Sequence, residues 1–513
     1  MKIMKKANPK FLLILLLITF CISHKILAQT NSERLTNISA AIPAIDKLFE
    51  YYAEQHHFPG LVYGLVVDGK LIHTGNLGYS NIAEKNLADG KSAFRIASMT
   101  KSFTAMAILK LRDEGRLKLD DAVSLYIPEM KDQKHLTTDV PAITIRHLLM
   151  HAAGFPEDNP WGDRQLAISD EAFIQMIKSG ITFSNGPGLT FEYSNMGFAM
   201  LGYIIKKVSG QSYQTYITEN ILNPLGMTHT YWEYSKVPAK DLAHGYRWLD
   251  EQWVEQALLH DGAYGAMGGL ITSIEDFSKY AAVHLAAWPP RNDEEKGPLK
   301  RSSLREMQFP WNFIGVDPQF THLSGRACPI AFAYGYGLVW QKDCENRVLI
   351  EHSGGLPGFG SNWMIMPDYG LGVISFSNLT YAPMPGINLQ VLDTLIALSK
   401  IQPRILPVSA ILNQRKNELI QLLPEWENPA ATHIFAENFF MDYFSATLRK
   451  EAINIFTEAG NIIHIQELIP ENNLRGSFIM EGEYSDIEIG FTLTPENPPL
   501  IQQYYIKKRK KGN

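Results

Sequence analysis

Cysteine is scarce in this sequence, with three cysteines among 513 residues, and the zinc-binding patterns CxxC and HExxH are absent. The adjacent pair His56 and His57 is poorly placed to share one metal ion. We therefore expect no metal site, and no motif for another cofactor is evident. Cys328 and Cys344 could pair as a disulfide in an oxidising compartment or remain a buried free pair, and their spacing alone leaves both open.

Long apolar runs are also missing, apart from FLLILLLITFCI near the start of the chain. Lysines precede this run and the small residue Ala28 closes it, which is typical of a secretory signal peptide, and the run is too short to span a bilayer comfortably. We expect cleavage of residues 1–28, with a lipid anchor on Cys21 as the weaker alternative because Phe20 occupies a position that favours a small residue. The mature protein would be periplasmic or secreted, without a stable membrane span.

An excess of positive charge is lacking too. The chain has 47 basic and 53 acidic residues, and loss of residues 1–28 would remove five lysines and no acid. No basic stripe with interleaved aromatic residues is evident, so we expect no nucleic-acid partner. The terminal basic run Lys507–Lys511 is most simply a solvated tail.

Compositional bias toward disorder is absent as well. With 45% hydrophobic and 11% aromatic residues the chain can bury sizeable cores, and its length suggests two or three domains. Apolar spacing predicts a helix over Ile42–His57, followed by two strands around the turn DGK, and strand signals return from Tyr336. Further helices are expected at Ser98–Glu114, Ile145–Met150, Glu171–Ser179, Met196–Ser209 and Gly386–Leu398. Strands at both ends with helices between them indicate an α+β fold whose sheet is assembled from remote pieces.

The character of the sequence changes after Lys400. The run IQPRILP reads as a linker and one helix follows, so residues 401–430 are assigned to a linker and a helix. From His433 onward, short alternating runs such as NIIHIQEL and DIEIGFTL dominate. We expect a separate small β-rich domain over residues 431–508, without a catalytic constellation of its own.

The stretch RIASMTKSFTAM places a lysine three residues after a serine within an apolar run. On a helix, Ser98 and Lys101 share one face, and an amide at the helix start points toward incoming negative charge. A serine becomes a good nucleophile when a neighbour takes its proton, and burial beside Phe103 and Met106 could lower the lysine pKa enough for that task. An isolated SxxK is more simply a helix cap beside a lysine that reaches solvent.

Two further segments favour the catalytic interpretation. FEYSNMGF presents Tyr193 and Asn195 just before an apolar helix, and IEHSGGLPGFGS presents His352 at a strand end, followed by Gly354 and Gly355. A phenolate stabilised by a lysine can act as a base, an asparagine can hold a substrate amide, and glycines let the backbone approach a ligand. Each feature alone has a structural explanation, but together in this order they are specific.

On SMTK, YSN and HSGG in this chain order, residues 40–400 resemble the serine β-lactamase and penicillin-binding protein superfamily. The resemblance is to the branch that contains class C β-lactamases, D-alanyl-D-alanine carboxypeptidases, D-aminopeptidases and related esterases. It implies a β-lactamase/transpeptidase-like α+β domain, with an antiparallel sheet flanked by helices and a helical subdomain. The β-rich segment after it looks like the extension that follows the hydrolase domain in some bacterial homologues.

The resemblance also implies roles for residues of the site. Ser98 would be the acylated nucleophile, Lys101 its proton acceptor or electrostatic partner, and Tyr193 a second base that also protonates the leaving group. Asn195 would orient the substrate and the lysine. The backbone amides of Ser98 and Gly355 would form the oxyanion hole.

One departure from the family pattern concerns the third motif, which usually begins with lysine and here begins with His352, ahead of Gly354 and Gly355. A histidine is mostly neutral near pH 7, so binding of a substrate carboxylate by this motif should weaken. We therefore expect a D-amino-acid peptidase or an esterase that acts on a small molecule or a peptide, including cell-wall peptide. A β-lactamase proper and a non-hydrolysing penicillin-binding or sensor protein are the alternatives.

Two other motif interpretations are disfavoured. The chain has no GxSxG, the pattern of an α/β-hydrolase nucleophile. The glycine-rich GAYGAMGG lacks the lysine and the preceding strand of a phosphate-binding loop, and we expect it to be a loop that lines the cleft.

Overall fold

A computed structural model describes residues 33–404 and 406–511 of the chain, so the expected signal peptide lies outside the described residues. The chain divides into two compact units, Met1–Pro403 and Arg404–Asn513, which are described separately. Within the described ranges, no helix combines the length and the apolar character needed to cross a bilayer.

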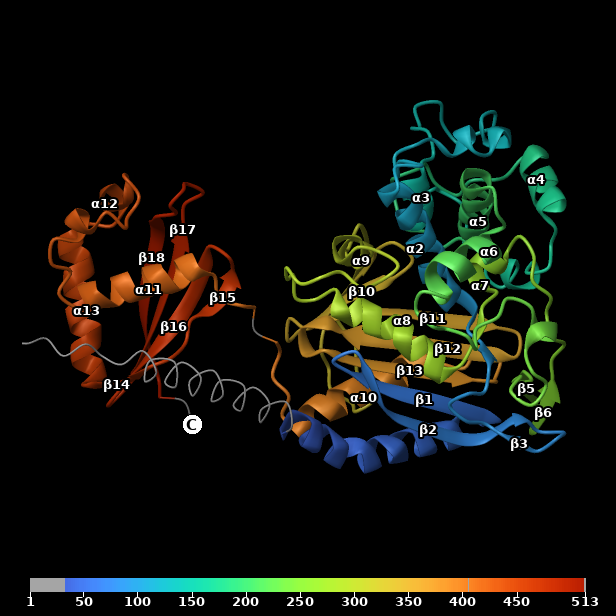
Figure 1. The fold of residues 1–513 in the computed structure, drawn as a ribbon, viewed down its shortest axis with the longest axis horizontal. Helices are drawn as coiled ribbons and strands as arrows, with labels where there is room; N and C mark the ends of the chain where they lie inside the picture. Colours follow the sequence, from blue (N-terminus) through green and yellow to red (C-terminus); the bar gives the residue numbers. More distant parts are fainter. Residues whose placement is uncertain (1–32, 405, 512–513) are drawn as a thin grey trace, which may run out of the picture. The chain divides into compact units, whose positions relative to one another are not determined.

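The first unit is built on a nine-stranded antiparallel sheet with the order β3-β2-β1-β13-β12-β11-β10-β9-β8 (Figure 1). The early strand β1 pairs with the late strand β13, with Tyr63 opposite Ser375, which confirms the expected assembly from remote pieces. The strands are β1 (Gly60–Val67), β2 (Lys70–Asn81), β3 (Asn86–Leu87), β8 (Asn312–Asp317), β9 (Ile330–Tyr334), β10 (Val339–Asp343), β11 (Val348–Leu356), β12 (Phe359–Met366) and β13 (Leu371–Ser377).

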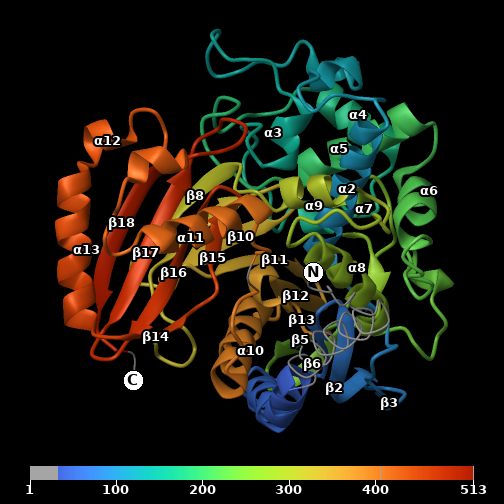
Figure 2. The same ribbon diagram turned by 60° about the vertical axis from the view of Figure 1, so that its left-hand side comes forward.

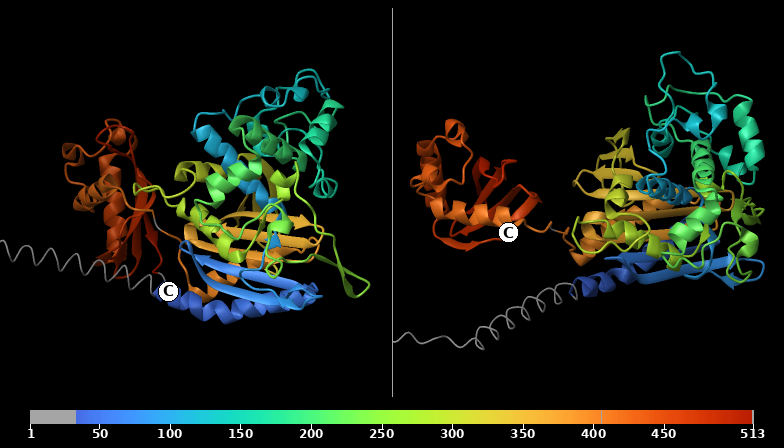
Figure 3. Two further views of the ribbon diagram at one scale, coloured as in Figure 1. Left: turned by 45° about the vertical axis from the view of Figure 1, so that its right-hand side comes forward. Right: turned by 45° about the horizontal axis from the view of Figure 1, so that its top comes forward.

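Helices cover both faces of this sheet. The N-terminal helix, described over residues 33–55, and α10 (Met384–Ser399) pack on one face, and α8 (Ile274–Ala286) packs on the other (Figures 1 and 3). Because side chains alternate along a strand, Leu65 of β1 enters one core and Val66 enters the other. Burial on both faces explains why this strand reads as a continuous apolar run.

A helical subdomain stands at one end of the sheet (Figures 1 and 2). Its centre is α5 (Asn195–Ser209), which packs against α2 (Thr100–Asp113). The α5 helix begins with Ser194, whose side chain accepts a hydrogen bond from Gly197 N, and ends at Gly210 in the left-handed region, with φ 77°. The other helices are α3 (Ile145–Leu149), α4 (Asp170–Lys178), α6 (Tyr213–Ile217), α7 (Gly265–Gly268) and α9 (Arg301–Met307).

The second unit holds the expected small sheet, with the order β14-β16-β17-β18 and β15 paired to β16. Two helices share its core. Helix α11 (Ala410–Leu422) lies within residues 401–430, where a linker and a helix are expected, whereas α13 (Ser445–Ala459) differs from the prediction because it falls within the stretch expected to be strands. Its remaining elements are α12 (Phe439–Asp442), β14 (Ile462–Ile465), β15 (Ile469–Asn472), β16 (Arg475–Gly482), β17 (Asp486–Leu493) and β18 (Ile501–Arg509) (Figure 2).

The terminal basic run is not the solvated tail that the sequence suggested. Its first three residues continue strand β18, which pairs with β17. Lys508 forms an ion pair of 2.7 Å with Glu458, and Lys511 Nζ donates to the backbone oxygen of Glu483 at 2.8 Å. The side chains of this run are exposed, and part of the run is held by strand pairing and by partners in the same unit.

The structure also decides between the two alternatives for the cysteines, because Cys328 and Cys344 form a disulfide. The bridge joins the segment before β9 to the end of β10, close to one edge of the large sheet. Next to it, Arg347 makes ion pairs with Asp343 at 2.6 Å and with Asp393 at 2.8 Å. The covalent link and the ion pairs together hold the outer strands of the sheet.

We predict that the double variant Cys328→Ala/Cys344→Ala unfolds at a lower urea concentration than the wild type. A disulfide that closes a loop of this length stabilises a protein by roughly 3 kcal/mol. Urea titration with and without reductant measures the effect, and reductant should destabilise the wild type but not the variant. Equal midpoints for the oxidised wild type and the variant would contradict this role.

Candidate active site

Ser98 lies in a tight turn that precedes helix α2, and not in the first turn of the continuous helix that the sequence suggested. The turn is a 3₁₀ helix over Ala97–Met99, and Ala97 has a positive φ of 50°, a strained conformation for a residue with a side chain. Neighbouring strands hold this turn, because Ile96 N donates to Leu270 O at 3.0 Å. The backbone therefore presents the serine at a sharp bend, with a helix start directly behind it.

Gly354 supports this turn from strand β11. A β-carbon at Gly354 would lie 2.1 Å from the backbone oxygen of Ile96 and 3.1 Å from the Ala97 side chain. The hydroxyl of Ser361 donates to the same Ile96 oxygen at 2.8 Å. Gly354 thus faces the nucleophile turn, where the close approach needs glycine, whereas Gly355 lines the pocket. This placement replaces the expected substrate contact of Gly354 with a packing role.

Lys101 is fully buried, and its amine contacts three neutral groups. Lys101 Nζ lies 3.0 Å from Ser98 Oγ, 2.7 Å from Asn195 Oδ1 and 3.1 Å from the backbone oxygen of Met267. Burial lowers the pKa of Lys101 to about 7, although the charges of Asp163 and Asp158 oppose the shift. A substantial fraction of the lysine is therefore neutral near pH 7.

These contacts suit a neutral amine. An uncharged lysine has two N–H donors and one lone pair. Asn195 Oδ1 and Met267 O can take the two donors, which leaves the lone pair for the hydroxyl hydrogen of Ser98. The geometry therefore places a proton acceptor against the serine, as activation of a hydroxyl nucleophile requires.

Tyr193 completes the cluster from the segment before α5. Its ring centroid lies 4.8 Å from Lys101 Nζ, and the ring packs beside His151 at 4.3 Å between centroids. Burial raises the pKa of Tyr193, and a hydrogen bond with Ser98 only partly opposes this shift. In the resting site Tyr193 is therefore a phenol that can donate a proton to a leaving group, and its further role as a base stays a prediction.

A loop that the sequence left unplaced contributes Asn159, Pro160 and Asp163 to one wall of the site. The carboxylate of Asp158 accepts from the backbone amides of Asn195 at 2.6 Å and of Met196 at 2.8 Å, which caps helix α5. Asn159 Oδ1 accepts from Asn195 Nδ2 at 2.5 Å, so the amide that holds Lys101 is itself held. Asp158, Asn159 and Asp163 were missed because their only signal was a loop-forming composition.

The glycine-rich stretch after Asp261 is also placed differently from the prediction. It forms the short buried helix α7 beneath the lysine, and not a loop that lines the cleft. The backbone oxygen of Met267 on this helix accepts from Lys101, and that of Ala266 accepts from Thr104 at 2.7 Å. The helix therefore contributes one carbonyl oxygen to the buried amine of Lys101 and a second to Thr104 on α2.

His352 is buried in the pocket wall, and both of its ring nitrogens are engaged. Nδ1 donates to the backbone oxygen of Ser353 at 2.6 Å, and Nε2 accepts from the hydroxyl of Tyr334 at 2.8 Å. Burial and, to a smaller extent, the charge of Lys101 lower the pKa of His352 to about 3. A neutral imidazole therefore occupies, near pH 7, the position that carries a lysine in the usual motif.

These residues surround a pocket of about 550 Å³. Strand β10 pairs with β11 only as far as Val339 opposite Glu351, whereas β12 continues along β11 to Leu356. Among the described strands, none pairs with the second edge of β11 from His352 to Leu356, so an extended ligand could bind there. The described residues contain no group of three or more metal-ligating side chains that could hold an ion.

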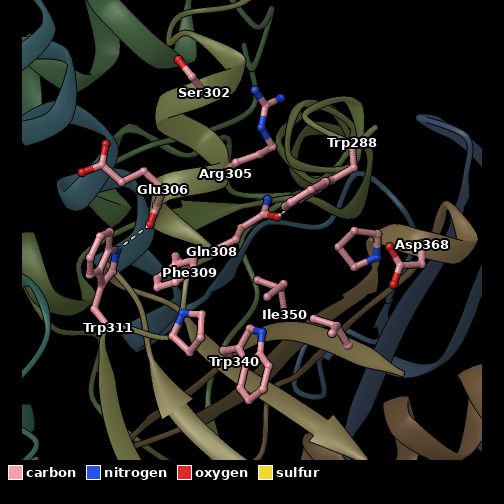
Figure 4. A pocket seen from close by; sticks show the side chains of 13 residues that line it. Trp288, Ser302, Arg305, Glu306, Gln308, Phe309, Trp311, Trp340, Ile350 and Asp368 are labelled. Carbon is pink, nitrogen blue, oxygen red and sulfur yellow. Dashed lines mark hydrogen bonds between the residues drawn. The ribbon is translucent and has the colours of Figure 1, made fainter. Parts of the chain in front are cut away.

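A second cavity, of about 540 Å³, lies between α9 and strands β10 and β11 (Figure 4). Aromatic side chains, among them Trp288, Trp311 and Trp340, form much of its wall. Trp288 Nε1 donates to Gln308 Oε1 at 2.7 Å, and Trp311 Nε1 donates to a backbone oxygen at 2.8 Å. Among the described residues that line this cavity there is no lysine, so it offers no pair like Ser98 and Lys101.

Residues 45–397 match the family described as Beta-lactamase. The chain belongs to this family. Protein flp of Staphylococcus aureus (strain COL) is 32% identical over 386 residues, which cover 75% of this chain and 71% of that protein. Penicillin-binding protein 4* of Bacillus subtilis (strain 168) is 26% identical over 349 residues, which cover 65% of this chain and 71% of that protein.

A solved structure agrees with the fold of this beta-lactamase family member. The octameric penicillin-binding protein homologue from Pyrococcus abyssi superposes with a TM-score of 0.56 at 23% identity, covering 91% of this chain and 90% of that one. The resemblance on the three motifs and the expected α+β architecture are confirmed. Because members of the family are serine hydrolases, the protein is an enzyme of that class.

We predict that the rate of Ser98 acylation rises about tenfold per pH unit below pH 7 and levels off above it, because only the neutral form of Lys101 can accept the serine proton. Labelling by a fluorophosphonate between about pH 5 and about pH 9 measures this rate. The variant Lys110→Ala, which removes a partly exposed lysine from the same helix, should keep the profile. A profile without an inflection near 7 would contradict the role of Lys101.

Proposed function

We propose that the protein is an exported hydrolase that forms an acyl-enzyme on Ser98 from an amide or ester substrate. The observation that supports this most is the contact of 3.0 Å between a fully buried Lys101 amine and the Ser98 hydroxyl. No other arrangement among the described pockets combines a nucleophile with a base in this way. Export agrees with the expected signal peptide and the disulfide.

In the first step, Ser98 Oγ attacks the carbonyl carbon of the substrate while its proton passes to Lys101 Nζ. The negative charge that develops on the carbonyl oxygen is received by the backbone amides of Ser98 and Gly355. The carbon–nitrogen or carbon–oxygen bond then breaks, and Tyr193, a phenol in the resting site, donates the proton that the leaving group needs. Proton transfer from Lys101 restores the phenol.

In the second step, a water molecule attacks the acyl-enzyme carbonyl carbon. Its proton returns through Lys101 and Tyr193, and the bond to Ser98 Oγ breaks with reprotonation of the serine. The acid product leaves and the resting site is restored. Asn195 acts throughout by holding the lysine amine, since its own amide is fixed by Asn159.

The substrate that fits best is a peptide-like amide or a simple ester. An extended chain can form backbone hydrogen bonds with the free edge of β11, next to the reacting serine. The neutral His352 offers no charge for a substrate carboxylate, which favours D-amino-acid peptidase or esterase chemistry over strong β-lactamase activity. Similarity to penicillin-binding protein 4* favours, as the second candidate, a protein that is acylated by penicillin and hydrolyses it slowly.

We predict that Ser98→Ala lowers turnover of p-nitrophenyl esters by more than about 1000-fold, because it removes the group that is acylated. Intact-mass spectrometry should show a fluorophosphonate adduct on the wild type and none on the variant. Ser102→Ala is the matched control, since Ser102 is buried on the same helix and donates to Met99 O. Full activity of Ser98→Ala would rule out the proposed nucleophile.

The decay of a penicillin adduct separates the two candidates. Loss of the adduct within seconds to minutes, with stoichiometric excess of product, indicates a hydrolase. An adduct that persists for hours without turnover, on a protein that is also inactive toward esters and amides, indicates the penicillin-binding alternative.

We predict that a peptide substrate with an amidated C-terminus is hydrolysed about 10-fold more efficiently than the same peptide with a free carboxylate, since an uncompensated anion costs about 1.4 kcal/mol or more. The values of kcat/KM for the two peptides, measured at several salt concentrations, test this. Preference for the free carboxylate would contradict the conclusion that the neutral His352 leaves a substrate carboxylate without a positive partner.

A further inference from the structure

The pocket beside Ser98 is lined by a buried carboxyl group. Among the described residues that line it, Asp163 is the only one with an acidic or permanently basic side chain. Asp163 is 2% exposed, and one of its carboxylate oxygens accepts the hydroxyl of Tyr381 at 2.9 Å. No ion pair joins Asp163 to a lysine or arginine of the described chain. A buried carboxylate with a single neutral donor is therefore unusual, because burial of an anion is costly without a cation.

Burial raises the pKa of Asp163, so a cation bound beside the carboxylate would stabilise its ionised form. The nearest buried amine, Lys101, has a lowered pKa and is engaged by three neutral groups. Asp158, the other acid close to Lys101, adds negative charge. Two arginines influence this region from outside the pocket wall: Arg164 is exposed, and Arg247 on the short strand β5 (Tyr246–Leu249) is partly exposed.

Aromatic rings accompany the carboxylate. Phe191, Tyr334 and Tyr381 line the same pocket as Asp163. The faces of such rings attract cations, most strongly where water is excluded. The Tyr381 ring lies against Gly355, since a β-carbon there would be 2.7 Å from its Cδ1 atom. The carboxylate and its aromatic partner therefore lie next to the strand that would position the scissile bond.

We propose that Asp163, together with the Tyr381 ring, binds a cationic amino group of the substrate. This inference rests on the proposed function and specifies its substrate class: amides or esters that carry an ammonium group close to the scissile bond, in the acyl portion or in the leaving group. The ammonium would be the positively charged partner that the Asp163 carboxylate lacks in the described structure. The aromatic rings would shield this ion pair from water. Asp163 is in this account a specificity residue that touches the substrate.

Two matched substrate pairs test the proposal on the wild-type protein. Alanine p-nitroanilide, as the D and L forms, is compared with its N-acetyl derivative, which lacks the charge in the acyl portion. Acetylcholine is compared with 3,3-dimethylbutyl acetate, which has the same shape without the charge in the leaving group. We expect kcat/KM for the charged member of at least one pair to exceed that of the neutral member by about 10-fold or more. Equal values in both pairs, or preference for the neutral members, would overturn the proposal.

A variant then assigns the preference to Asp163. Asp163→Asn keeps the size of the side chain and the contact with Tyr381 but removes the charge, and the ratio of charged to neutral kcat/KM should fall to about 1. Glu157→Gln is the matched control, because it removes an exposed acid from the same loop and should keep the wild-type ratio. If Asp163→Asn lowers both members of a pair equally, Asp163 only supports Lys101 and the proposal fails.

The outcome can be separated from failure of the proposed function. Labelling of Ser98 by fluorophosphonate and turnover of the neutral ester report the nucleophile and do not depend on a charged substrate. A protein that passes these two tests without charge preference refutes the ammonium site alone. A protein that fails both, with Ser98 unlabelled, refutes the proposed hydrolase and the ammonium site with it.

Discussion

The structure depends on the burial of one amine, that of Lys101, among neutral partners. Water is excluded from Lys101, and no carboxylate contacts its Nζ atom in the described structure, so its pKa falls to about 7. A carboxylate at any of the three contact positions would restore the charge and remove the base. A neutral Lys101 amine therefore depends on the absence of water and carboxylates from its contacts as much as on the three neutral groups that hold it.

Much of the fold can be understood as the means of holding those partners in place. Helix α5 carries Asn195, helix α7 provides the oxygen of Met267, and the turn before α2 presents Ser98. These elements come from remote parts of the chain and meet beside strand β11, whose Gly354 allows the turn to approach within van der Waals contact. The strained φ of Ala97 persists because hydrogen bonds from Ile96 N to Leu270 O and from Ser361 Oγ to Ile96 O hold the adjoining residue.

The sequence predicts the motif residues of the site better than it predicts the loop residues that surround them. Ser98, Lys101, Tyr193 and Asn195 are recognisable because their chemistry depends on residue type and on spacing along helices, which local sequence determines. Asp158 and Asp163 lie in a loop whose position is set by tertiary contacts, so composition indicated a loop and nothing more. Tertiary contacts also decide the pairing of Cys328 with Cys344, which spacing left open. Helix α13 was difficult to predict for another reason, because few of its positions are buried and its helical signal is weak within an alternating segment.

The ionisation state of Lys101 can be measured directly. Lysine labelled with ¹³C at Cε gives an NMR signal that shifts when the amine loses its proton, and the variant Lys101→Arg identifies the resonance by its absence. We predict that this one signal titrates near pH 7. Titration of Lys101 near 10.4, roughly the value of a free lysine side chain, would contradict this role of burial.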